Sequence, residues 1–143
     1  MSLHGRFEQG LNRRSAGLGD DAPNFVCKDR RLHSPHVALD PPCDAAREKM
    51  IHAFRWNRRP RLSVAAVPPG RYAVYAYIWE ETSSETLTVA ANGRVVARDV
   101  RSGLKGEWQR LGPWYVDVAK GALTITSTGG AANFSGIEIW QKK

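Results

Sequence analysis

The chain has 143 residues, 42% of them hydrophobic, which is enough for one domain whose core needs neither a metal nor a disulfide. No apolar run is long enough to cross a bilayer, and residues 1–6 lack the apolar stretch of a secretory signal. The formal net charge of +7 makes an acidic partner worth considering. We therefore expect a single domain over residues 1–143 without membrane insertion.

The first third of the chain reads as irregular, because residues that favour turns recur between residues 17 and 42. Only short strands are predicted there, at residues 6–11 and 25–28. One short helix is predicted over residues 44–51, where Asp44 can act as the N-cap and Glu48 follows it.

From residue 62 onward, short segments rich in β-branched and aromatic residues alternate with turns. Asn92-Gly93 is the strongest hairpin signal in the chain. The absence of a helix-length segment between the predicted strands favours a sandwich or a barrel over βαβ units. Strands are predicted at residues 62–67, 71–79, 86–91, 94–99, 108–111, 115–118, 123–127 and 135–140.

The segment 72–79 predicts one apolar face and one aromatic face, because the side chains of a strand alternate between the two faces of its sheet. The face better suited to the core carries Tyr72, Val74, Ala76 and Ile78. The opposite face carries an aromatic stripe, which the N-terminal region, a second sheet or a ligand must cover. This second set is Ala73, Tyr75, Tyr77 and Trp79.

The densest positive charge lies in residues 55–61, with the sequence RWNRRPR. Such a segment is typical of contact with a polyanion, either nucleic acid or an acidic polysaccharide, but more often it is a solvated loop. We do not expect nucleic acid to be the partner, because no RNP-like, zinc-finger or helix-turn-helix pattern accompanies the charge.

Two cysteines and two histidines lie close together in the sequence, at Cys27, His33, His36 and Cys43. A disulfide between Cys27 and Cys43 would close a short loop and stabilise the irregular region by about 3 kcal/mol. Two free buried thiols are the alternative. A zinc site is a third option, although the spacing matches no zinc module and lacks a CxxC pair.

The sequence contains no catalytic motif of the G-x-S-x-G, H-E-x-x-H, P-loop or G-x-G-x-x-G type. Glu80 and Glu81 could be imagined as the two carboxylates of a glycosidase. Adjacent residues of a strand face opposite ways, however, so the two cannot both reach one sugar in regular strand geometry. We expect a protein that is not an enzyme and needs no cofactor.

Four segments match the pattern of one known family, in the family's order and over about half of the chain. They are residues 68–80 (PPGRYAVYAYIWE), 86–99 (TLTVAANGRVVARD), 118–125 (VAKGALTI) and 134–139 (FSGIEI). With these motifs the chain resembles malectin-like domains, and more generally carbohydrate-binding-module-like β-sandwiches.

The resemblance implies an all-β fold: a jelly-roll-like antiparallel β-sandwich with an irregular N-terminal region and at most a short helix. It also implies a carbohydrate-binding role and a secreted or cell-surface location. In the family, an acidic residue near the last strand contacts the sugar. That position corresponds here to Asn133, whose amide can still donate and accept hydrogen bonds.

We predict non-catalytic binding of carbohydrate, in which aromatic rings stack on a sugar and polar side chains contact its hydroxyls. The alternative is a structural module that binds itself or another protein, with the same rings in the core or at an interface. Strand alternation groups three of the rings, and the turn before residue 133 lies at a sheet end, where binding loops gather. The predicted ligand-binding residues are Trp56, Tyr75, Tyr77, Trp79, Glu80, Trp108, Arg110 and Asn133.

Overall fold

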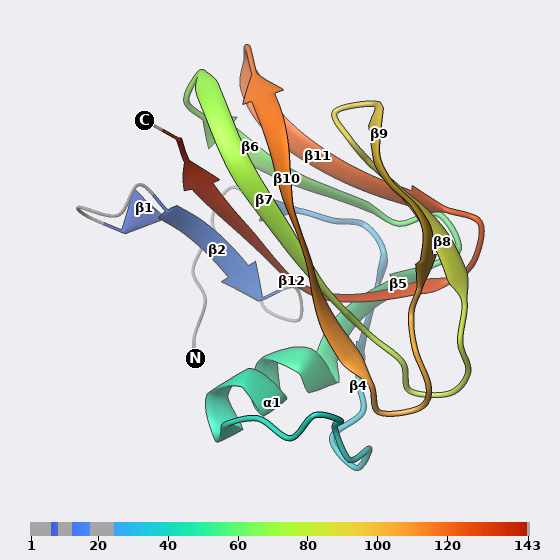
Figure 1. Cartoon of the computed structure of the whole chain (residues 1–143). Coiled ribbons are helices and arrows are strands. Elements are labelled where there is room, and N and C mark those ends of the chain that lie inside the picture. Colours follow the sequence, from blue (N-terminus) through green and yellow to red (C-terminus); the bar gives the residue numbers. More distant parts are fainter. Residues whose placement is uncertain (1–6, 9–12, 18–24, 143) are drawn as a thin grey trace.

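Two antiparallel sheets packed face to face form the protein in the computed structural model, which describes residues 7–8, 13–17 and 25–142 (Figure 1). Sheet A consists of β1 (Phe7–Glu8), β2 (Arg13–Gly17), β4 (Arg30–His33), β5 (Ala53–Asn57), β7 (Gly70–Trp79), β10 (Trp108–Val118) and β12 (Ala132–Gln141). Sheet B consists of β3 (Phe25–Val26), β6 (Arg61–Val67), β8 (Thr86–Ala91), β9 (Arg94–Arg101) and β11 (Gly121–Thr128). The predicted all-β sandwich is confirmed.

The closing strand β12 lies in the middle of sheet A. Along one edge it pairs with β7, which in turn pairs with β10. Along its other edge β5 pairs with residues 132–134, and β2 pairs with residues 136–140. The outward-facing side chains of β7 and β12 therefore occupy the centre of the outer face of sheet A.

The main core lies between the two sheets and includes the apolar face predicted for β7. All four residues of that face are at most 1% exposed. They pack with leucine, isoleucine and valine side chains from β6, β8 and β11 of sheet B. Burying one such side chain stabilises the fold by about 1.5–3 kcal/mol, so this alternation fixes which face of β7 turns inward. These four core residues are Tyr72, Val74, Ala76 and Ile78.

A second hydrophobic cluster covers one end of the outer face of sheet A. It is formed by α1 (Ala45–His52), by the loop before it and by aromatic residues of β5 and β7. The helix lies against this end of the sandwich in Figure 1. The carboxylate of Asp44 caps it by accepting a hydrogen bond from the Arg47 N–H at 2.8 Å. The N-terminal region thus covers part of the aromatic stripe, and both the helix and its cap are confirmed.

The strands that sequence patterns missed depend on pairing more than on local composition. β4 and β5 were not predicted; they pair with each other, and β5 also pairs with the first residues of β12. The two strands predicted at 108–111 and 115–118 are one strand, β10, with an irregularity between Leu111 and Trp114. Gly112 lies at this irregularity with φ of 110°, and a side chain there would collide with the Val74 carbonyl.

The disulfide considered for Cys27 and Cys43 does not form, and both residues are free thiols. Cys27 packs against the core between the sheets, whereas Cys43 packs against the outer cluster. Burial raises the pKa of the Cys27 thiol to about 11, so this sulfur stays protonated at neutral pH and is a poor nucleophile.

Two further features follow from the described residues alone. Within them, no group of three or more His, Cys, Asp or Glu side chains is arranged to hold a metal ion. No helix in the same part of the chain is both long enough and apolar enough to cross a membrane.

Candidate functional site

Four of the eight predicted residues meet on the outer face of sheet A. The rings of Tyr77 on β7 and Trp108 on β10 stack, with their centres 6.4 Å apart and their planes at 24°. The Arg110 guanidinium lies 3.6 Å from the centre of the Tyr75 ring. Arg110 is directly opposite Tyr77 in the register of the two strands, and cross-strand neighbours on one face contact each other.

Glu138 on β12 connects these side chains. Its carboxylate accepts hydrogen bonds from the Arg110 guanidinium at 2.7 Å, from the Trp140 indole N–H at 2.6 Å and from the Tyr77 hydroxyl at 3.2 Å. The residue is only 6% exposed, so three donors stabilise a charge that is largely removed from water. Burial, and next the charge of Glu138, raise the pKa of Tyr77, which keeps the phenol protonated as a donor.

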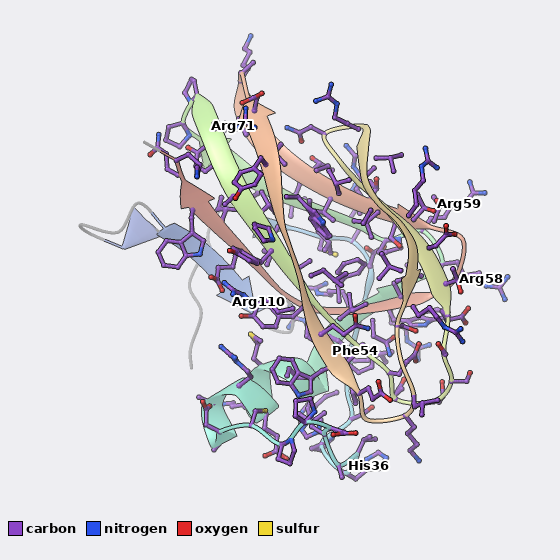
Figure 2. All side chains as sticks on the ribbon, in the orientation of Figure 1. His36, Phe54, Arg58, Arg59, Arg71 and Arg110 are labelled. Atoms are coloured by element: carbon purple, nitrogen blue, oxygen red, sulfur yellow. The ribbon has the colours of Figure 1, made fainter. Side chains whose placement is uncertain are left out.

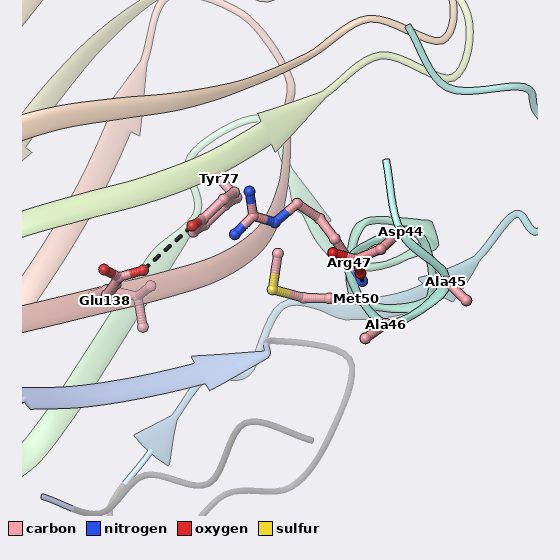
Figure 3. Close-up of a pocket in the computed structure, with 8 residues that line it drawn as sticks. Asp44, Ala45, Ala46, Arg47, Met50, Tyr77 and Glu138 are labelled. Atoms are coloured by element: carbon pink, nitrogen blue, oxygen red, sulfur yellow. Dashed lines mark hydrogen bonds between the residues drawn. The ribbon is translucent and has the colours of Figure 1, made fainter. Parts of the chain in front are cut away.

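A pocket of about 480 Å³ opens beside Glu138, between sheet A and the first turns of α1 (Figure 3). Tyr77 and Glu138 line it from the sheet, and Asp44, Arg47 and Met50 line it from the helix. Figure 3 shows Arg47 extending from the helix toward Tyr77. The volume falls in the range of about 300–1,000 Å³ that is usual for small-ligand sites.

Arg47 places a positive charge beside this pocket, at an unusual position for a cation. Its guanidinium lies 5.5 Å from the Tyr77 ring centre and 5.7 Å from that of Trp108. The first turn of a helix is an unfavourable place for a cation, because the helix dipole is positive there. Among the described side chains no carboxylate forms an ion pair with Arg47. Its guanidinium can therefore donate hydrogen bonds to a ligand.

Trp79 and Glu80 lie away from this surface. Trp79 is fully buried, and its ring meets those of His52 and Phe54 edge to face at 5.6 and 5.3 Å. It therefore packs in the second cluster. Glu80 is 5% exposed and accepts a hydrogen bond from the Ser102 hydroxyl, which joins the loops after β7 and β9.

Trp56 and Asn133 lie at the end of the sheet. They face each other across the β5–β12 pairing. Asn133 is 7% exposed, and the half-buried Trp56 lines a separate pocket with residues 129–131. The residues predicted to form one cluster thus fall into an outer-face group, a buried pair and a pair at the sheet end.

The prediction from sequence missed three residues of the outer-face group, namely Glu138, Trp140 and Arg47. Strand alternation could have found the first two. Ile137 and Ile139 point into the core, so Glu138 between them must point outward. Arg47 could not be found in this way, because its place over two rings depends on how α1 packs against sheet A.

No family model and no curated protein matches this sequence. Solved structures do match. The extracellular domain of ANXUR1 from Arabidopsis thaliana has a TM-score of 0.71 at 13% identity, covering 99% of this chain and 53% of its own length. A calcium-binding mutant of Bacteroides uniformis β-glucuronidase 2 has a TM-score of 0.70 at 15% identity, covering 94% of this chain and 18% of that one. The chain has a malectin-like β-sandwich fold.

A third similar structure is a Podospora anserina β-(1,4)-mannanase named as a GH26-CBM35 protein, with a TM-score of 0.53 at 9% identity. The match covers 92% of this chain and 28% of the mannanase. The sandwich of this chain is therefore similar in fold to a part of a protein whose name includes CBM35. It spans only about half of the ANXUR1 domain and a smaller part of both enzymes.

Proposed function

We propose that this malectin-like sandwich binds carbohydrate without catalysis, in the pocket between α1 and the outer face of sheet A. The observation that supports this proposal most strongly is the fixed carboxylate of Glu138, which three donors hold beside the pocket and beside the stacked rings of Tyr77 and Trp108. The residues implicated in this way are preorganised, since most of them lie on paired strands.

The chemistry of the pocket suits a sugar better than it suits a purely apolar ligand. A pyranose has an apolar C–H face that packs on an aromatic ring, and hydroxyls around its edge that need partners. Of the described aromatic rings, Tyr77 lines the pocket itself, and the half-buried rings of Tyr75 and Trp108 lie next to it on the outer face of sheet A. Arg47 offers N–H donors, and the carboxylates of Asp44 and Glu138 offer acceptors.

The same contacts favour binding over hydrolysis. A glycosidase needs one carboxyl that can release a proton and a second carboxylate that can act as a nucleophile or base. Both carboxylates that line this pocket already accept hydrogen bonds: Asp44 caps α1, and Glu138 accepts from three side chains.

Since ANXUR1 matches through its extracellular domain, we also propose a secreted or cell-surface setting.

Two variants test the outer-face site, each with a matched control. Trp108→Ala removes one of the stacked rings, and Arg47→Gln removes the cation above it. Tyr115→Ala and Arg94→Gln remove an exposed ring and an exposed cation elsewhere on the sandwich. Binding of neutral gluco-, manno- and xylo-oligosaccharides is first screened on an array and then measured by isothermal titration calorimetry.

We expect Trp108→Ala to weaken neutral-glycan binding about tenfold or more. The analogy is with the ~1–3 kcal/mol lost when an aromatic side chain that stacks on a nucleic-acid base is removed. Arg47→Gln should weaken it severalfold, and both controls should bind like the unmodified protein. Thermal melts must remain cooperative for the comparison to hold. Unchanged binding in both pocket variants would contradict the site. Absence of any glycan binding, together with a stable oligomer in light scattering, would favour the alternative of a protein-interaction module.

A further inference from the structure

The basic segment at residues 55–61 does not act as one unit in the fold. Arg55 lies in β5, is 7% exposed and donates to the backbone carbonyls of Cys27 and Asp29 at 3.3 and 3.0 Å. Its charge therefore serves the packing of the sandwich. Arg58 and Arg59 are exposed in the turn between β5 and β6. Figure 2 shows both at one margin of the molecule, well away from Arg110 on the outer face of sheet A.

The turn that carries Arg58 and Arg59 is held by a small network around Asp29. The Asp29 carboxylate accepts hydrogen bonds from the Asn57 amide and from the Arg61 backbone N–H, both at 2.8 Å. The Asn57 side-chain oxygen in turn accepts from the Arg59 backbone N–H at 3.2 Å. This side-chain capping fixes the backbone of the turn, so the two guanidinium groups extend from a defined base.

A pocket of about 570 Å³ lies beside this turn, at the end of the sandwich. Arg58, Arg59 and the half-buried Trp56 line one side, and Glu85 with the turn at residues 129–131 lines the other. Gly129 has φ of 100°, and a side chain there would approach the Thr86 carbonyl to 2.9 Å. That side of Gly129 is packed against the backbone of β8, while the glycine itself is exposed and contributes backbone to the pocket wall.

The charges lining this pocket favour an anion. Two guanidinium groups face one carboxylate, that of Glu85. Within the described residues, neither arginine forms an ion pair with Glu85 or with any other carboxylate. Arginine binds carboxylate and sulfate groups in a planar, two-pronged manner, and the indole of Trp56 adds a flat apolar surface beside them.

We propose that this pocket is a second binding site, separate from the outer-face pocket, and that it takes the carboxylate or sulfate group of an acidic glycan. Arg58 and Arg59 would bind the anionic group while Trp56 packs against the sugar ring that bears it. A glycan is favoured over a nucleic acid because the site is one pocket with a single aromatic ring, rather than a basic groove that follows a strand with successive rings.

The test compares two double variants that each remove two positive charges. Arg58→Gln with Arg59→Gln changes the proposed site. Arg94→Gln with Lys120→Gln changes the opposite end of the sandwich, because Arg94 follows the β8–β9 turn and Lys120 precedes β11. The probes are a heparin hexasaccharide for sulfate, an oligogalacturonate of the same length for carboxylate, and single-stranded DNA of similar charge. Binding is measured by calorimetry at several salt concentrations.

We expect the Arg58/Arg59 variant to lose about tenfold or more in affinity for at least one acidic glycan, since hydrogen bonds to charged groups are strong. For this variant, the slope of log affinity against log salt concentration should become less negative by about 1.5, as expected from the counterion release seen for phosphates. The Arg94/Lys120 variant should change affinity less than threefold. Glu85→Gln should strengthen binding by up to about fivefold, because it removes a like charge from the pocket.

Three results would overturn the proposal. The first is equal binding by the Arg58/Arg59 variant and the unmodified protein. The second is an equal loss in the Arg94/Lys120 variant, which would show a general charge effect. The third is DNA binding that is as tight as glycan binding and depends on the same arginines. The outer-face site is judged separately, with neutral glycans and with Trp108→Ala.

Discussion

Replacing Glu138 with alanine should be among the most damaging single changes on the outer face of sheet A. From the described residues the carboxylate accepts three hydrogen bonds, and two of them, from Arg110 and Trp140, are 2.7 Å or shorter. The Arg110 side chain is 39% exposed, so its contribution is discounted to about 1 kcal/mol. The Trp140 and Tyr77 bonds to a buried charge add about 2 kcal/mol together. Glu138→Ala should therefore destabilise the fold by about 3 kcal/mol.

For a chain of this size that loss corresponds to a fall of about 10 °C in Tm. Urea unfolding followed by tryptophan fluorescence measures the free energy, and calorimetry measures Tm. Glu138→Gln keeps the shape of the side chain and one acceptor oxygen, so it should lose only about 1–2 kcal/mol. If Glu138→Ala melts like the unmodified protein, this carboxylate does not organise the face, and the support for the outer-face site is lost.

Three further predictions concern the elements around the site. Burial raises the pKa of Glu80 above its usual 4.5, so ionising it destabilises the fold; Glu80→Gln should raise Tm at pH 7, and this advantage should vanish as a pH series of melts falls to about 4. Asp44→Ala removes the N-cap of α1 and should cost about 1 kcal/mol in urea unfolding. Gly112→Ala should cost at least about 2 kcal/mol in the same assay, because φ is 110° and the Val74 carbonyl blocks the side chain.

The fold was largely predictable because its signals are local and repeated. The period-two pattern of β7 identified both the strand and the face that turns inward, and Asn92-Gly93 marked the β8–β9 hairpin. β4 and β5 were missed for a physical reason. Their residues include Arg30, Arg31 and Arg55; β5 becomes a strand because β12 offers an edge to pair with, and β4 then pairs with β5. Pairing between segments that are distant in the sequence cannot be predicted from the propensities of a few neighbouring residues.

The candidate site was predictable only where it depends on strand register. Alternation correctly grouped Tyr75 with Tyr77, but it also grouped Trp79, which α1 and the loop before it bury completely. Alternation predicts which face of the sheet a side chain points to, but it does not predict which other elements of the fold cover that face. The position of Arg47 and the separation of Trp56 from the outer-face rings both depend on tertiary packing.

The buried carboxylate and its hydrogen-bond donors on the outer face of sheet A cost more free energy than a surface that served packing alone would need. A buried carboxylate with an arginine partner is often no more stabilising than well-packed apolar side chains of the same volume. The same strand already supplies isoleucines on its inner face, at Ile137 and Ile139. At Glu138 it instead carries a carboxylate, held by donors from three side chains on three strands. Such a network fixes the directions of the aromatic rings and guanidinium groups around it, and fixing them before a ligand arrives lowers the entropic cost of the sugar binding that we propose.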